Sequence, residues 1–231
     1  MIDVLLALAL AGAAVPAAAA DSPQAAAPAQ AGSPDEPEKP ARSAGATRVA
    51  NWIAASGDNH ALPYIIIDKP AARAFLFDSD GNALSDAPVL IGVAPGDDAT
   101  PGIGAKSLAE IGPAEKTTPA GRFLARFGIA AGNKKMLWVD YATSVGLHPI
   151  PPGTQKEHRR ERMLSPAIED NRITFGCINV PIAFYNKGVV PQFGKKGGYV
   201  YVLPDTKPLE EVFPRLKVQA YYESTAAQLA K

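Results

Sequence analysis

Cys177, the one cysteine of this 231-residue chain, is the residue best suited to covalent chemistry. A chain with a single cysteine cannot form an internal disulfide, so its thiol is free, reactive or paired with another molecule. Gly176 beside it has no side chain and can adopt backbone conformations closed to other residues. Thr174 and Asn179 bring a hydroxyl and an amide close to the thiol in sequence. Free cysteine is also among the most often buried residue types, so a structural thiol is the competing interpretation.

A thiol becomes a nucleophile when a base or a positive charge lowers its pKa, and histidine is the obvious base. The chain has three histidines. His60 lies in a polar, turn-like stretch and His158 in a run of charged residues, and both contexts are typical of a solvated surface. His148 ends the apolar segment 144–147 and precedes Pro149. Because the ends of strands present side chains from a rigid backbone, we predict that His148 rather than His158 is the base.

The elements that must position these groups are predicted to be short strands separated by turns. The expected strands are 64–68, 74–77, 88–93, 122–129, 136–140, 144–148 and 198–203, with short helices over 47–56 and from 181 to 185. Turn sequences such as Asp78-Ser79-Asp80-Gly81 lie between them. Short strands with close turns favour an antiparallel or mixed sheet over alternating βαβ units. We therefore expect one mainly β domain over 47–207, with a few short helices.

The two ends of the chain have a different composition from this region. Residues 1–20 hold an apolar run followed by small residues, which indicates a secretory signal peptide, with an uncleaved membrane anchor as the alternative. Residues 21–46 are rich in alanine and proline and predict a disordered linker. Residues 208–231 form a C-terminal tail without an assigned structure. This organisation predicts a protein of the periplasm or cell envelope.

Charge and composition exclude several classes of partner. Lys+Arg and Asp+Glu are balanced at 23 each, so we expect no binding to nucleic acid. The glycine-rich stretch 102–107 lacks the Gly-Lys-Ser/Thr order of a phosphate loop, so we expect no nucleotide there. We also expect no other cofactor, no metal site and a monomeric protein.

Three motifs resemble the L,D-transpeptidase catalytic domain, the YkuD-like family of bacterial cell-wall enzymes. Residues 118–123 (Thr-Pro-Ala-Gly-Arg-Phe) resemble the family's Thr-Pro-x-Gly-x-Phe element, and His148 resembles its strand-end histidine. Residues 174–179 (Thr-Phe-Gly-Cys-Ile-Asn) match its Ser/Thr-His-Gly-Cys-x-Asn pattern at all but one position, where Phe175 replaces histidine. The resemblance covers about 62–203.

The resemblance implies a mixed β-sandwich or barrel-like fold and a two-step acyl transfer. The Cys177 thiolate would attack the L-to-D peptide bond after the diamino acid of a peptidoglycan stem tetrapeptide and release the terminal D-alanine. The thioester would then be resolved by an amine of a second stem peptide, by an anchored envelope protein or by water. His148 would take the thiol proton and pass it to the leaving amine. The carbonyl of Pro149 would orient the imidazole.

The same resemblance assigns supporting roles around the cysteine. Backbone N–H groups at Gly176 and Cys177 would form the oxyanion hole. Thr174 and Asn179 would hold the loop, and Arg172 and Phe175 would contact the substrate. A further group, the arginines at positions 159, 160 and 162, could pair with substrate carboxylates, although their charged context is more typical of a solvated face.

Two alternatives to a transferase remain open. The insertion 151–172 also keeps a second histidine, His158, as a candidate for the base. An L,D-carboxypeptidase or amidase would use water as the acceptor on the same scaffold. A catalytically weak wall-binding module would keep the fold and the groove, and Phe175 at the family's histidine position suggests it. The insertion makes the separation of His148 and Cys177 longer than is usual in the family, so that His158 fits the family spacing better.

Overall fold

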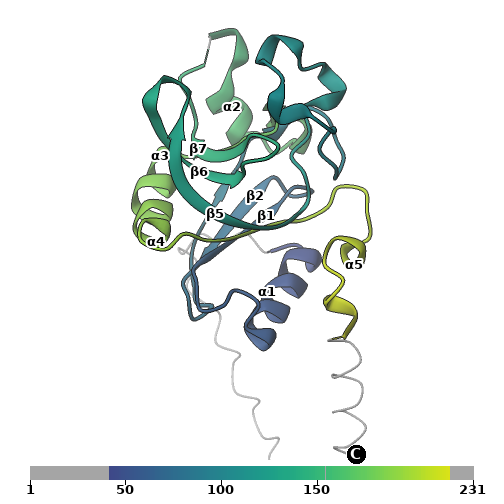
Figure 1. The fold of residues 1–231 in the computed structure, drawn as a ribbon, viewed down its shortest axis with the longest axis vertical. Helices are drawn as coiled ribbons and strands as arrows, with labels where there is room; N and C mark the ends of the chain where they lie inside the picture. Colours follow the sequence, from purple (N-terminus) through teal and green to yellow (C-terminus); the bar gives the residue numbers. More distant parts are fainter. Residues whose placement is uncertain (1–41, 154, 219–231) are drawn as a thin grey trace, which may run out of the picture. The chain divides into compact units, whose positions relative to one another are not determined.

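The computed structural model describes residues 42–153 and 155–218 (Figure 1). The expected signal peptide, most of the expected linker and residues 219–231 of the expected tail lie outside the described residues. None of the helices in the described ranges has the length and apolar character needed to cross a membrane.

A mixed sheet of eight strands forms the centre of the fold. Its order is β3 (Ala83–Pro88), β2 (Arg73–Phe77), β1 (Tyr64–Asp68), β10 (Gly198–Val202), β5 (Gly121–Ala130), β6 (Lys134–Asp140), β7 (Val145–Pro149) and β9 (Ile178–Val180). The pairs β1–β10 and β7–β9 are parallel, and the other neighbours are antiparallel. A second sheet pairs β4 (Ile91–Gly92) with β8 (Arg172–Thr174) in parallel.

The two edges of the large sheet, β3 and β9, are joined by the residues that follow β3. Leu90 and Asn179 exchange two backbone hydrogen bonds, each with an N···O distance of 2.9 Å. This contact bends the sheet into a nearly closed, barrel-like arrangement (Figure 1). The expectation of a mainly β, mixed and barrel-like fold with a few short helices is therefore confirmed.

Apolar side chains on the inner face of the sheet form the main core. Fully buried members come from most strands of the sheet: Ile65, Ile67, Leu76, Ala125, Leu137, Leu147, Ile178, Val180, Val200 and Val202. A continuous helical segment made of α3 (Ile182–Phe184), a π-helical stretch (Tyr185–Val189) and α4 (Val190–Phe193) packs against them through Phe184, Val189 and Phe193. The helix expected from 181 to 185 is therefore longer than the sequence suggested.

A second core lies on the other face of β1, β2 and β10, where α1 (Ala44–Ser56) and the segment around α5 (Leu209–Val212) pack. Trp52 of α1 lies 6.1 Å from Tyr201 and 6.3 Å from Phe213, measured between ring centroids. Phe213 and Leu216 are almost fully buried. Burying such side chains is favourable by about 1.5–3 kcal/mol each, so the beginning of the expected tail packs as part of this folded unit.

The N-terminal boundary also differs from the expected one. Ser43 caps α1 by accepting a hydrogen bond from the Ala46 N–H at 3.1 Å. The helix therefore begins at Ala44, and Ala46 is fully buried, whereas we expected the linker to run to residue 46.

The strand expected over 88–93 is wrong in its bounds, because Pro88 ends β3 and only Ile91 and Gly92 of the residues after it form a strand, β4. The chain instead forms β3 at 83–88, an exposed edge strand of mostly polar and small residues, and then crosses the core. Val89, Leu90 and Ile91 are fully buried during this crossing. Their apolar character thus reflects burial between the two sheet edges rather than one long strand.

The remaining connections are short turns and helices. The expected loop 94–113 contains 3-10 turns at Ile103–Ala105 and Leu108–Glu110, and a third begins at its end, Pro113–Glu115. The insertion 151–172 contains a turn at Gln155–Glu157, helix α2 (Arg159–Leu164) and a turn at Ile168–Asn171. It ends where β8 begins.

Candidate functional site

His148 lies on β7, and Cys177 lies directly before the adjacent parallel strand β9, on the same face of the sheet. Leu147 pairs with Ile178 and His148 with Asn179, so Cys177, directly before β9, lies opposite Gly146. Leu147 and Ile178 point into the core. Because side chains alternate along a strand, Cys177 and His148 both point away from the core. A separation of two residues along the strands and one strand spacing corresponds to about 8 Å between their Cα atoms.

The hydrogen bonds around His148 define one neutral tautomer of the imidazole. Arg159 donates through Nη1 to Asn179 Oδ1 at 2.9 Å, and a guanidinium can only donate. The amide nitrogen of Asn179 therefore faces His148 Nε2, at 3.2 Å, and donates to it. His148 Nδ1 then carries the proton and donates to the Pro149 carbonyl at 2.9 Å. The imidazole is held by the Pro149 carbonyl, as the resemblance implied.

The surroundings of His148 favour the neutral form. Burial lowers its pKa below the ordinary value of 6.5, and the positive charges of Arg159 and Lys134 lower it further. The hydrogen bond to Pro149 opposes this shift. At neutral pH, His148 therefore has an unprotonated Nε2 that can accept a proton.

The surroundings of Cys177 favour the protonated thiol. The residue is partly exposed, and its Sγ lies 3.7 Å from the Ser144 carbonyl oxygen, to which it donates. Burial of the sulfur raises the pKa of Cys177, and a hydrogen bond from the Gly146 backbone partly opposes the rise. No hydrogen bond among the described residues joins Cys177 to His148. A reaction that uses both groups requires the thiol to leave Ser144 and the Asn179 amide to leave Nε2.

The backbone turn before Cys177 is fixed by two threonine hydroxyls. Thr174 Oγ1 accepts from the Gly176 N–H at 3.1 Å and donates to the Cys177 carbonyl at 2.6 Å. Thr118 Oγ1 donates to the Gly176 carbonyl at 2.8 Å and accepts from the Gly92 N–H at 2.9 Å. Thr174 thus holds the loop as expected, and Thr118, whose motif indicated no such role, also holds it.

Gly176 is required by both the conformation and the packing of this turn. Its φ is +122°, and a Cβ at this position would lie 2.7 Å from the Thr117 carbonyl oxygen. Because Thr174 accepts the Gly176 N–H, that group is already engaged. The Cys177 N–H takes part in none of the hydrogen bonds of the described residues, so it is the better placed of the two expected oxyanion donors.

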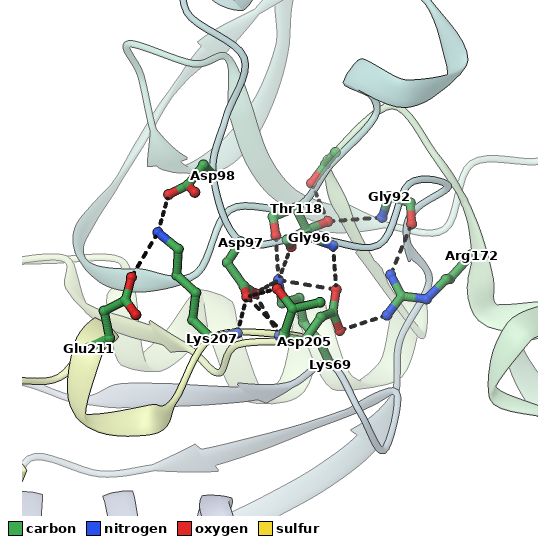
Figure 2. Close-up of polar contacts among 12 residues, drawn as sticks. Lys69, Gly92, Gly96, Asp97, Asp98, Thr118, Arg172, Asp205, Lys207 and Glu211 are labelled. Atoms are coloured by element: carbon green, nitrogen blue, oxygen red, sulfur yellow. Dashed lines mark hydrogen bonds and ion pairs between the residues drawn. The ribbon is translucent and has the colours of Figure 1, made fainter.

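A buried network of charges anchors the residues that hold the turn (Figure 2). Lys69 has a fully buried side chain, and its Nζ donates to the Gly96 carbonyl at 2.6 Å, to Asp97 at 3.0 Å and to the Thr118 carbonyl at 2.9 Å. Asp97 also accepts from the backbone N–H of Asp205 at 2.6 Å and of Lys207 at 2.7 Å.

Arg172 belongs to this network rather than to an open binding surface. Its Nη2 donates to Asp205 Oδ1 at 2.7 Å, and its side chain is only 16% exposed. Asp205 in turn lies 3.4 Å from Lys69 Nζ, so two carboxylates and two cations face one another in the interior. The expectation that Arg172 contacts substrate has no support in this arrangement, because its guanidinium is already paired.

Phe175 lies at the surface beside the turn. It is 39% exposed, and Lys116 Nζ lies 3.7 Å from the centroid of its ring, within the range of a cation–π contact. The ring is therefore accessible at the edge of the cysteine loop, where it can contact a bound molecule.

The other basic residues of the insertion have different environments. The expectation of a solvated face is wrong for Arg159, whose side chain is only 13% exposed and contacts Asn179 and Glu157. Arg162 donates to the carbonyls of Asp170 and Arg172. His158 has a φ of +45°, is exposed, and lies 4.0 Å from Glu161. It is a surface residue, as its charged context indicated.

Comparisons with known proteins do not add a family assignment. No protein-family model matches the chain, and no curated protein matches it. Within the described ranges, no group of three or more histidine, cysteine, aspartate or glutamate side chains could hold a metal ion.

Proposed function

We propose that this protein is a cysteine-dependent acyltransferase of the L,D-transpeptidase kind, acting on peptidoglycan stem peptides in the cell envelope. The observation that carries the proposal is the position of His148. It is a neutral base held in one tautomer by Pro149 and Asn179, on the same sheet face as the only thiol and one strand away from it.

The first step of the proposed reaction is acylation of the thiol. His148 Nε2 takes the proton from Cys177, and the thiolate attacks the carbonyl carbon of the L-to-D bond of a stem tetrapeptide. The Cys177 N–H stabilises the charge that develops on the carbonyl oxygen. As the tetrahedral intermediate collapses, the C–N bond breaks, and the leaving amine of D-alanine takes the proton from His148.

The second step resolves the thioester. An amine of another stem peptide attacks the thioester carbonyl and loses its proton to His148. The C–S bond then breaks, and the Cys177 thiolate recovers the proton. Water in place of the amine would give a carboxypeptidase product from the same intermediate, so the acceptor alone separates transfer from hydrolysis.

One observation favours a second candidate, a wall-binding module with weak catalysis. The resting thiol donates to Ser144, and His148 Nε2 is occupied by Asn179, so the pair is not poised for proton transfer. Catalytic hydrogen bonds often form only when substrate is bound, and we therefore prefer the enzyme.

Incubation with purified stem tetrapeptides tests the proposal and separates its alternatives. We expect cross-linked dimers together with free D-alanine, detected by liquid chromatography and mass spectrometry, and none from the Cys177→Ala variant. Trimmed tripeptides without dimers would identify a hydrolase. Binding to isolated cell wall without any product would contradict both enzymes and identify the module.

A further inference from the structure

The sheet face that carries Cys177 continues across two more strands without interruption. Gly146, opposite Cys177, pairs with Trp138 of β6, and Trp138 pairs with Arg126 of β5. These four residues thus form one row across β9, β7, β6 and β5, and paired residues of neighbouring strands point to the same side. At one strand spacing per step, Arg126 lies about 14 Å from Cys177, a distance that about four residues of extended peptide span.

The middle of this row is flat and partly aromatic. Gly146 has no side chain, and Met136 covers it, since a Cβ at Gly146 would lie 2.6 Å from the Met136 terminal carbon. Trp138 covers Gly128 in the same way, at 2.7 Å. Tyr141 packs edge-on against Trp138 with ring centroids 5.0 Å apart and is 78% exposed. Aromatic surfaces of this kind cover the aliphatic parts of a ligand.

The far end of the row is basic. Arg126 lines a surface hollow of about 420 Å³ together with Leu124, Gly128, Trp138 and Tyr141. It also lines a neighbouring hollow of about 480 Å³, whose wall includes Lys195 and Lys196. Neither wall contains an aspartate or a glutamate, and the Arg126 guanidinium forms no hydrogen bond or ion pair with any residue that the structure describes. The three cations are therefore complementary to an anionic ligand.

We propose that this surface is a subsite for a carboxylate of the peptidoglycan stem peptide. The Arg126 guanidinium binds the carboxylate through its two-pronged geometry, and Trp138 and Tyr141 cover the aliphatic part of the peptide between Arg126 and the thiol. The inference rests on the proposed function for the identity of the peptide. The surface itself rests on the row of residues and on the unpaired charge.

Direct binding to inactive protein tests the subsite without requiring catalysis. In the Cys177→Ala background, isothermal titration calorimetry with a synthetic stem tetrapeptide is expected to show binding about 10-fold weaker after Arg126→Gln, the cost of losing one charged contact. The affinity of the Arg126→Lys variant is expected to lie between those of the Arg126 protein and the Arg126→Gln variant. Lys187→Gln removes a positive charge from an exposed residue that lines neither hollow, and it is expected to leave binding unchanged.

Chemical blocking of the ligand identifies the group that Arg126 binds. A tetrapeptide with amidated carboxylates is expected to bind the parent protein about 10-fold more weakly, but to bind the Arg126→Gln variant as well as the free acid does. The subsite is overturned if Arg126→Gln weakens binding no more than Lys187→Gln does. It is also overturned if amidation weakens binding equally with and without Arg126.

Two kinetic measurements on protein that retains Cys177 show whether the donor or the acceptor stem peptide occupies the subsite. Slower thioester formation without acceptor after Arg126→Gln assigns it to the donor. Unchanged thioester formation with a raised KM for the acceptor assigns it to the second stem peptide. If no thioester forms in any variant while Arg126-dependent binding persists, the proposed activity fails and the subsite stands. If activity is normal but Arg126→Gln does not weaken peptide binding, the subsite proposal alone is contradicted.

Discussion

At the scale of single residues, the environment of His148 is the feature that separates a base from a structural histidine. Its Nδ1 is fixed by the Pro149 carbonyl, and its Nε2 faces an amide whose orientation is set by Arg159. The insertion that lengthens the chain between His148 and Cys177 therefore supplies the residue that determines the tautomer. His158, which fits the spacing of the resembled family better, lies at the surface.

Arg159 is expected to contribute, beside burial of the imidazole, to the lower pH limit of the proposed reaction. The proposed acylation requires neutral His148, so its rate is expected to fall as pH drops through the pKa of His148. The charge of Arg159 helps to hold this pKa below 6.5. Arg159→Gln removes that charge, so the pKa rises and the acid limb of the pH–rate profile of acylation moves to higher pH.

The adjacent Arg160 provides a matched control for this measurement, because it is exposed on the same helix. Arg160→Gln is expected to leave the acid limb in place. An acid limb that moves to lower pH in Arg159→Gln, or that moves equally in both variants, would show that Arg159 does not tune His148.

At the scale of elements, the turn that holds Cys177 depends on a residue from a distant loop. Thr118 joins the Gly176 carbonyl to the Gly92 N–H, and its own carbonyl accepts from buried Lys69. The Thr-Pro-x-Gly element therefore stabilises the cysteine loop and also leads into β5.

Thr118→Val is expected to reduce the free energy of unfolding by about 1–3 kcal/mol, because two buried backbone groups lose their partner. Acylation of Cys177 should slow in parallel, since the turn is no longer held. Urea denaturation and single-turnover kinetics measure the two effects. Thr118→Ser keeps the hydroxyl and is expected to restore most of both; equal loss in Val and Ser variants would rule out the hydrogen bonds as the cause.

Sequence patterns predicted the strands where local composition and burial agree. The strand at 64–68 has the expected bounds because an unbroken β-branched run is buried on both faces. The crossing at 88–93 was misassigned because the same kind of apolar run arises where a chain passes through a core. The polar edge strand β3 has no apolar alternation, so pairing with β2 alone defines it.

At the scale of the whole molecule, a buried charge network connects β1, the loop after β4, the turn before β5 and the segment after β10 (Figure 2). Sequence could not reveal it, because Lys69 stands beside Pro70 in a stretch that resembles an ordinary surface turn. The tertiary fold alone brings Asp97 and Asp205 to the lysine. The same holds for Phe213, whose burial depends on contact with Trp52.

The Asp97 carboxylate is expected to make the free energy of unfolding decrease at acidic pH. Burial would raise its pKa, but hydrogen bonds from the backbone of Asp205 and Lys207, from Thr206 and from Lys69 hold it well below the ordinary value of 3.8. A pKa lowered by folding stabilises the protein above the unfolded value. That stabilisation is lost as pH falls below about 4 towards the folded pKa.

Asp97→Asn is therefore expected to cost about 3–5 kcal/mol at pH 7, because it leaves Lys69 buried without its nearest counter-charge. It should also flatten the fall in unfolding free energy between pH 4 and about pH 2, measured by urea denaturation. Asp98→Asn is the matched control, since the Asp98 side chain is 75% exposed. An acid dependence that Asp97→Asn leaves unchanged would contradict the role given to the network.

The central claim is that Cys177 is a nucleophile activated by His148, and the mass of the intact protein after exposure to a carbapenem tests it most directly. We expect the unmodified chain to gain one covalent adduct and Cys177→Ala to gain none while remaining folded. The His148→Ala variant should acylate at least about 100-fold more slowly, and the His158→Ala variant should acylate at the normal rate. An adduct on Cys177→Ala, or a loss confined to His158→Ala, would contradict the account.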